Sequence, residues 1–204
     1  MLETRTPARR ALAPAAVDHA ARTGECADWR LSRVLGSGRW TRVYQARPKS
    51  LPADGPADYA LKVLRSECQG KPVARAALRR ESLVARQVSH RHLAPVLSEH
   101  LLAAPFHLVL PYLEGATLRN VLAALGGQRG MRPAIASWIV RQIAEGLQAL
   151  HAAGWLHGDV KPENILVGPQ GHATLLDLGL ARRIGSAECR AWETLQGTPA
   201  YAAP

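Results

Sequence analysis

The sequence is poor in cysteine and in aromatic residues. It holds three cysteines, Cys26, Cys68 and Cys189, which stand far apart in the 204 residues. An odd number at this spacing excludes a disulfide framework and a zinc site built from cysteine pairs, and it favours a reducing, cytoplasmic compartment. Aromatic residues make up 5% of the chain, with a single phenylalanine. No run of stacking rings for single-stranded nucleic acid is present, so no nucleic-acid partner is expected.

Carboxylates and long hydrophobic runs are also scarce. The chain has 16 acidic residues against 26 lysines and arginines, a net charge of +10, but the basic residues are scattered rather than gathered in one segment. The longest apolar run, near Leu101 to Leu113, is broken by His107 and two prolines. It is too short to cross a bilayer, which predicts a soluble protein without a membrane segment in this chain.

The hydrophobic content of 47% excludes a disordered composition, and the pattern changes along the chain. Residues 1–28 are rich in alanine and arginine and are expected to form a flexible leader. From Trp29, "WRLSRVLGSGRWTRVYQAR" predicts strand, glycine turn and strand, and "YALKVLR" predicts a further strand. A helix over 72–88 and strands within 96–102 and 106–112 complete a mostly antiparallel sheet with one helix.

The second half is predicted to be mainly helical. A short helix is expected over 117–125. Apolar residues at helical spacing predict a long helix over 133–151, and Gly154 is placed to end it. "ILV" and "ATLL" then form a hairpin around "GPQGH", and the chain from Asp177 onward is expected to be a loop. The fold class is therefore α+β.

Two groups of residues could handle phosphate. Gly36 and Gly38 lie between two strands, where backbone N–H groups can approach phosphate oxygens, although a hairpin turn also favours glycine. Glu81 projects from the apolar face of its predicted helix, where a carboxylate is costly unless it is paired. Lys62 on the neighbouring strand is the expected partner of Glu81.

The stretch "HGDVKPENIL" carries the second group. Asp159 and Asn164 lie close together, and Asp177 follows after the predicted hairpin. Two carboxylates and an amide are oxygen ligands that suit Mg²⁺, while Lys161 could neutralise a phosphoryl group during its transfer.

Five motifs, in order, resemble those of a eukaryotic-type serine/threonine protein kinase of bacterial style. They are the glycine-rich loop "GSGRWTRV", the lysine strand "YALK", the catalytic loop "HGDVKPEN", the metal-binding "DLG" and the activation-segment end "GTPAYAAP". The resemblance runs from about Leu31 to Pro204. It implies a bilobal kinase fold, with the N-lobe and hinge at 29–112 and a partial, mainly helical C-lobe at 113–204.

The resemblance also implies a role for each matching residue. Lys62, fixed by Glu81, would hold the phosphates of ATP, and Asp159 would orient and deprotonate the substrate hydroxyl. Lys161 would steady the γ-phosphate, Asn164 and Asp177 would hold Mg²⁺, and Thr198 would help to position a serine or threonine of a protein substrate. The implied ATP-binding residues, with Leu110 as gatekeeper and Pro111 to Leu113 as hinge, are Leu35, Gly36, Ser37, Gly38, Val43, Ala60, Lys62, Leu110, Pro111, Leu113 and Leu166.

Some positions depart from the family pattern. Thr41 replaces the third glycine of the loop, and Leu178 replaces a phenylalanine. Gly158 replaces the arginine that normally receives an activation-loop phosphate. The sequence stops at Pro204, where the pattern expects further helices, so we expect a fragment of a longer kinase whose helix from Pro133 exposes apolar surface.

Two alternatives stay open. One is an inactive, truncated pseudokinase that binds ATP. The other is a small-molecule phosphotransferase of the aminoglycoside or choline kinase kind, against which "KPEN" and "GTPAYAAP" argue.

Overall fold

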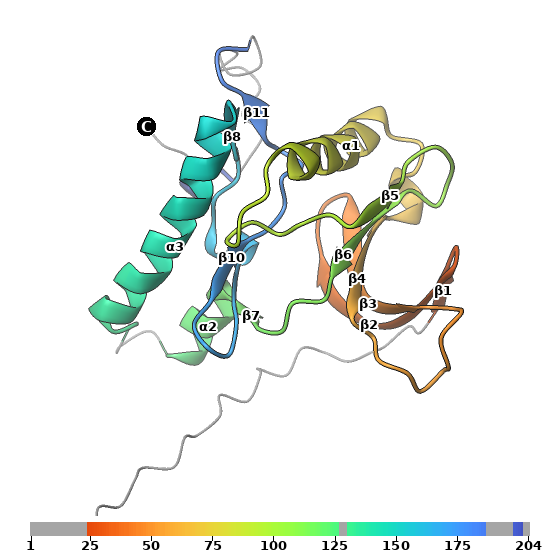
Figure 1. Cartoon of the computed structure of the whole chain (residues 1–204), viewed down its shortest axis with the longest axis horizontal. Coiled ribbons are helices and arrows are strands. Elements are labelled where there is room, and N and C mark those ends of the chain that lie inside the picture. Colours follow the sequence, from red (N-terminus) through yellow and green to blue (C-terminus); the bar gives the residue numbers. More distant parts are fainter. Residues whose placement is uncertain (1–23, 127–129, 187–197, 202–204) are drawn as a thin grey trace, which may run out of the picture.

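The computed structural model describes residues 24–126, 130–186 and 198–201 of the chain. A curled antiparallel sheet forms the first half (Figure 1). Its strand order is β1-β2-β3-β4-β6-β5, so β4, which carries Lys62, lies between two neighbours. The strands are β1 Gly24–Cys26, β2 Trp29–Ser37, β3 Thr41–Pro48, β4 Tyr59–Leu64, β5 Ser98–His100 and β6 His107–Pro111.

The sheet begins earlier than the sequence predicts. Strand β1 lies within the segment expected to be a flexible leader, and it pairs with β2 through Gly24–Leu31 and Cys26–Trp29. The chain turns at Ala27, which has a φ of +50°. Alanine gives little warning of such a turn, because glycine, asparagine and aspartate are the usual residues at a positive φ. Strand β1, Gly24–Cys26, therefore belongs to the sheet, and Ala27 and Asp28 form the turn to β2.

Helix α1, Pro72–Gln87, connects two apolar clusters. Ala74 and Leu78, near its start, pack with Leu108 of β6 in the cluster beneath the sheet. Val84, near its end, and Val88, just after it, belong to the main cluster of the second half. Glu81 lies between these two sets of contacts, so packing at both ends of the helix fixes its position.

The second half is built around helix α3, Pro133–Ala152, with the shorter α2, Leu118–Ala124 (Figure 1). The expected hairpin forms from β9 Ile165–Val167 and β10 Ala173–Leu175, and β7 Ala116–Thr117 adds a third strand. The segment from Asp177, expected to be a loop, contains a short strand within its described residues: β11 Arg182–Arg183 pairs with β8 Trp155–Leu156. Single 3₁₀ turns cover Ser66–Cys68, Pro162–Asn164 and Pro199–Tyr201.

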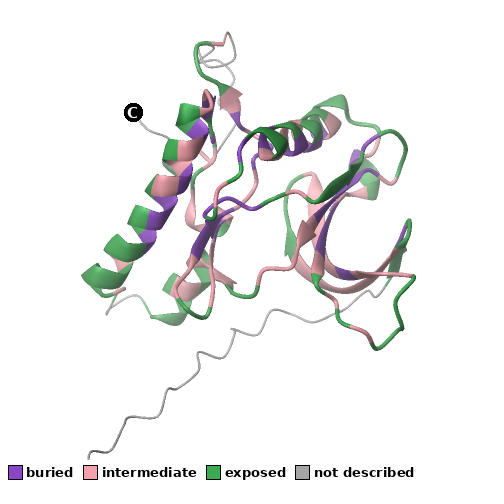
Figure 2. Cartoon of the chain, in the orientation of Figure 1, coloured by how far each residue is buried: buried purple, intermediate pink, exposed green. Residues whose placement is uncertain are grey.

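Helix α3 is buried along one face only (Figure 2). Ile139, Ile143 and Leu150 are in the core, whereas Trp138 and Val140 are 54% and 66% exposed. The apolar surface expected on this helix is therefore present. Across residues 24–126, 130–186 and 198–201, no helix combines the length and the apolar character that a bilayer crossing requires.

Candidate active site

Lys62 is the centre of a buried charge cluster. Its Nζ lies 2.6 Å from Glu81 Oε2, so the ion pair expected from the sequence forms. The same Nζ lies 2.8 Å from Asp177 Oδ1, a contact that the sequence did not suggest. Lys62 and Glu81 are almost fully buried, but the Asp177 side chain is 44% exposed. One ammonium thus serves two carboxylates, one inside the protein and one at its surface.

The pKa values of Glu81 and Asp177 shift in opposite directions, although both carboxylates contact the same Lys62 ammonium. Burial lowers the pKa of Lys62, but Asp177 and Glu81 outweigh it and hold that pKa above its usual range. Burial raises the pKa of Glu81 to about 7, although Lys62 opposes the shift. Burial acts in the same sense on Asp177, but Lys62 and the Gly179 N–H prevail and hold its pKa below the usual range. Asp177 is therefore ionised at neutral pH.

Asp159 lies in a second polar network on the loop between β8 and β9. Lys161 Nζ lies 2.6 Å from Asp159 Oδ2 and donates to Thr198 Oγ1 at 2.8 Å. The Thr198 hydroxyl donates to Asp159 Oδ1 at 3.0 Å. Asn164 Nδ2 donates to the Asp159 backbone oxygen at 2.8 Å and to Oδ2 at 3.0 Å. Asp159 thus contacts Lys161 and Asn164 of its own loop, and also Thr198, which lies 39 residues away in sequence.

His157 joins this network to the chain that leads to Asp177. Its Nε2 lies 3.0 Å from the Leu176 carbonyl, and its Nδ1 accepts from the Asp159 N–H at 3.2 Å. These partners assign the proton to Nε2, and burial lowers the pKa of His157, which favours the neutral ring. The Leu176 N–H also donates to the Asn164 carbonyl at 2.8 Å. Asp159, Asn164 and Asp177 are therefore held in register by backbone hydrogen bonds.

The residues proposed for the nucleotide lie on the strands around Lys62. Val43 of β3 is paired with both Gly36 and Lys62, and Ala60 is paired with Leu110. Gly36, Ser37 and Gly38 are exposed where β2 ends, and Leu35 and Val43 are half-buried. Pro111 ends β6, Leu113 follows it, and Leu166 lies on β9 in the other half. Leu178 is buried in the main cluster, and Thr41 opens β3.

Two features of the site were missed by the sequence reading. Arg119 of α2 pairs with Glu163 at 2.8 Å and donates to the Tyr201 hydroxyl, which ties α2 to the catalytic loop and to the segment with Thr198. Gly158 has a φ of +82°, and a Cβ built there would lie 2.3 Å from the Leu180 carbonyl oxygen. Glycine is therefore sterically required at position 158. The sequence alone showed only that glycine replaces the arginine of the family pattern there. The glycine and the proline of "HGDVKPEN" indicate a tight loop but do not identify the contact.

Comparison with known proteins finds a matching family and several relatives of this chain. The model of the protein kinase domain matches residues 29–204. The serine/threonine-protein kinase PknD of Mycobacterium tuberculosis is 35% identical over 176 residues, covering 86% of this chain and 26% of PknD. PknH of Mycobacterium bovis is 32% identical over 176 residues, covering 86% of this chain and 28% of PknH. PknL of Mycobacterium tuberculosis is 34% identical over 170 residues, covering 83% and 41%. The chain thus spans less than half the length of these relatives.

Proposed function

Since the chain belongs to the protein kinase domain family, we propose that it transfers the γ-phosphoryl group of ATP to serine or threonine hydroxyls of proteins. The observation that carries the proposal is the contact of Asp159 with the Thr198 hydroxyl at 3.0 Å, beside Lys161. In this contact, the Asp159 carboxylate accepts a hydrogen bond from an alcohol beside the Lys161 ammonium. A general base needs this reach, and such help contributes about 10²–10⁴-fold to a rate.

In the proposed reaction, a serine or threonine hydroxyl of the substrate donates to the Asp159 carboxylate. The hydroxyl oxygen forms the new bond to phosphorus, its proton passes to Asp159, and ADP leaves with the bridging oxygen. Lys161, 2.6 Å from Asp159, would steady the negative charge that the phosphoryl oxygens carry. Lys62, held by Glu81, would contact the phosphates that remain on ADP.

The chain's own oxygen atoms suit a magnesium ion. Asn164 uses its amide nitrogen for Asp159, which leaves the amide oxygen as the candidate ligand, and Asp177 is ionised and partly exposed. Among the residues that the structure describes, no group of three or more His, Cys, Asp or Glu could hold a metal. Mg²⁺ fits this limited set, because it binds through one or two carboxylates together with phosphate oxygens. When bound, it would neutralise phosphate charge.

The site also supports the remaining parts of the proposal. Leu35, Val43, Ala60, Leu110 and Leu166 are apolar and would flank the adenine, and the exposed glycines at the end of β2 would approach the phosphates. Pro111 and Leu113 would act as the hinge that binds the adenine edge. Cys26 and Cys68 are free, buried thiols, which supports a cytoplasmic location. A kinase that phosphorylates proteins there would act in signalling.

Transfer of labelled phosphate from ATP and Mg²⁺ to an acidic and a basic test protein examines the proposal directly. We expect labelled phosphoserine or phosphothreonine with the unaltered chain, and a loss of at least about 10²-fold with Asp159→Asn. Asp54→Asn, in the exposed loop between β3 and β4, is the matched control and should keep full activity. Labelling of an aminoglycoside or choline instead would support the small-molecule alternative. ATP binding without any transfer would support the pseudokinase.

A further inference from the structure

Arg33 of β2 links this strand to the proposed hinge through its side chain. Its Nη2 donates to the Tyr112 hydroxyl at 2.7 Å, and its guanidinium carbon lies 5.7 Å from the centre of the Tyr112 ring. Its Nε donates to Gln45 Oε1 of β3 at 2.7 Å. The Gln45 amide nitrogen donates in turn to the Ala57 carbonyl at 2.9 Å. Arg33, Gln45 and Tyr112 thus form one polar network, here called the β2–hinge bridge.

The β2–hinge bridge lies on the same face of the sheet as Lys62. Residues that are paired across antiparallel strands share a face, and every second residue of a strand returns to that face. Arg33 is paired with Gln45, Gln45 is paired with Ala60, and Lys62 lies two residues after Ala60 on β4. Strands β3 and β4 separate β2 from β6 (Figure 1), so Arg33 and Tyr112 meet across the sheet. The bridge therefore spans the hinge end of the face proposed for the adenine.

The pairing of β2 with β3 is irregular on both sides of Arg33. Its register shifts between Leu31 and Arg33 and again between Val34 and Gly36. Leu35, which is proposed to flank the adenine, lies within the second shift. Because such a shift interrupts the backbone hydrogen bonds between two strands, pairing alone holds this part of β2 less firmly. The bridge gives it a second attachment, made by side chains.

We propose that Arg33 and Tyr112 are positioning residues for the nucleotide. Their hydrogen bond holds β2, and Leu35 with it, at a fixed distance from the hinge before ATP binds. A slot formed in advance avoids the free-energy cost of ordering β2 during binding, so the bridge raises the affinity for the nucleotide without contacting the reacting phosphate. The inference rests on the proposed binding of ATP between the glycine turn and the hinge.

Isothermal titration calorimetry with the full chain tests the inference. The ligand is β,γ-methylene-ATP with Mg²⁺, whose terminal phosphoryl group is not transferred. Tyr112→Phe keeps the ring and removes only the hydroxyl. It should raise the dissociation constant about tenfold, because a hydrogen bond to a charged group is lost. Arg33→Gln should raise the constant at least as much, and the double variant no further than Arg33→Gln, because both changes remove the same contact.

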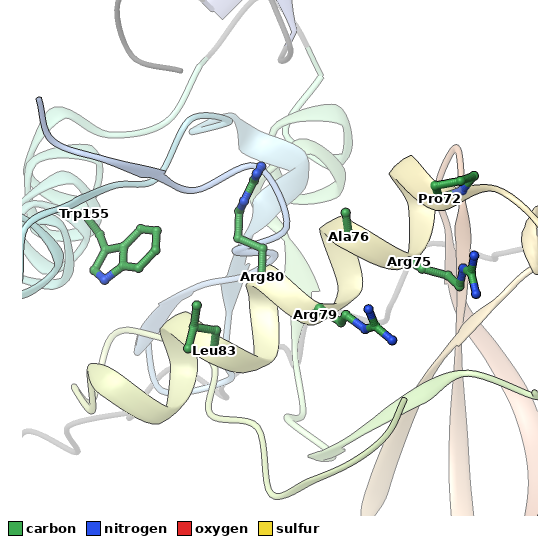
Figure 3. Close-up of a pocket in the computed structure, with 7 residues that line it drawn as sticks. All are labelled: Pro72, Arg75, Ala76, Arg79, Arg80, Leu83 and Trp155. Carbon is green, nitrogen blue, oxygen red and sulfur yellow. The ribbon is translucent and has the colours of Figure 1, made fainter. Parts of the chain in front are cut away.

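Two control variants match these changes outside the bridge. Tyr44→Phe removes a hydroxyl on the opposite face of β3, since Tyr44 is paired with Leu61 and precedes Gln45. Arg79→Gln changes an arginine of α1 (Figure 3), whose Nη2 donates to a backbone carbonyl at 3.4 Å. Both should bind the analogue as the unaltered chain does. Adenosine, which has no phosphates, should lose the same factor in Tyr112→Phe, because the bridge acts on the adenine end of the slot.

The melting temperature without ligand separates positioning from a purely structural role. We expect Tyr112→Phe to lower it by less than about 4 °C. A lower melting temperature with unchanged affinity for the analogue would assign the bridge to stability alone and would overturn the inference.

The remaining outcomes distinguish this inference from the proposed function. Equal binding of the analogue by the unaltered chain and Tyr112→Phe would overturn the role of the bridge and leave the proposed function standing. No binding by the unaltered chain would overturn both. Weaker binding of the analogue with unchanged binding of adenosine would place the effect at the phosphates and would contradict the inference.

Discussion

Gly158, directly before the catalytic-loop aspartate, is the residue whose replacement we expect to be least tolerated. Its φ is +82°, and an added Cβ would meet the Leu180 carbonyl oxygen at 2.3 Å. Gly158→Ala should lower the free energy of unfolding by at least about 2 kcal/mol, because strain and steric overlap act together. Gly185→Ala separates the two, since Gly185 has a φ of +77° but open space around it, and should cost only about 1 kcal/mol. Chemical denaturation measures the free energy of unfolding of both variants. Equal losses in the two would show that steric overlap with the Leu180 carbonyl adds nothing to the backbone strain.

Glu81 predicts a pH dependence of stability at the same scale. Burial raises its pKa to about 7, above the value of 4.5 expected in the unfolded chain. The folded state then binds the proton more tightly, so Glu81 lowers the free energy of unfolding as pH rises from about 4.5 to 7, by on the order of 3 kcal/mol. Asp177 acts oppositely: its pKa is lowered, so it contributes stability above pH 3.8 that is lost in stronger acid.

Comparison of the unaltered chain with Glu81→Gln isolates the contribution of Glu81 to the pH dependence of stability. Buried His92, His107 and His157 have lowered pKa values and give stability that rises towards pH 6.5, which overlaps with the Glu81 effect. Glu81→Gln leaves these histidines in place. Urea titrations between pH 5 and about 7 should therefore give a more positive slope of stability against pH in Glu81→Gln than in the unaltered chain. Identical slopes would contradict a raised pKa for Glu81.

At the scale of elements, α1 has one buried and one exposed face, and substitutions on the two faces should differ in their cost to stability. Leu78 is 1% exposed and packs under the sheet, whereas Leu83 is 49% exposed on the outer face. Leu78→Ala should lower the free energy of unfolding by about 2–5 kcal/mol, and Leu83→Ala by less than about 1 kcal/mol. Thermal denaturation of both variants checks this, and a comparable loss in Leu83→Ala would mean that the outer face contributes to the core.

The elements were predictable where hydrophobic periodicity is strong. The helix expected over 133–151 is α3, Pro133–Ala152, and the helix expected over 72–88 is α1, Pro72–Gln87. Strands β1 and β11 were missed, because each is too short for a period of two to be visible, and β11 also depends on pairing with the distant strand β8. The strands expected within 96–102 and 106–112 are present but shorter, as Ser98–His100 and His107–Pro111.

The candidate site was predictable in part. The Lys62–Glu81 pair followed from a carboxylate on an apolar helix face, which requires a partner. The contacts of Lys62 with Asp177 and of Thr198 with Asp159 could not follow from periodicity, because they join segments more than thirty residues apart in sequence. The steric role of Gly158 depends in the same way on where the Leu180 carbonyl lies.

At the scale of the whole molecule, we expect ATP with Mg²⁺ to stabilise the chain, because the proposed ligand contacts residues from both halves. Nucleotide at about 100 times its dissociation constant would add about 3 kcal/mol and raise the melting temperature. Asp177→Asn should remove the part of this shift that depends on Mg²⁺, while Asp54→Asn should keep it. A differential scanning fluorimetry titration with and without EDTA checks this, and a full shift in Asp177→Asn would remove Asp177 from the metal site.

Helix α1 has a consequence for how the two halves come apart. Ala74 and Leu78 are enclosed by side chains of the sheet, and Val84 by side chains of the second half. Neither half can lose its interior while the other keeps its own intact, since both interiors include the same sixteen-residue segment. Denaturation is thereby coupled across the molecule, and the halves behave as one cooperative unit rather than as independent folding blocks.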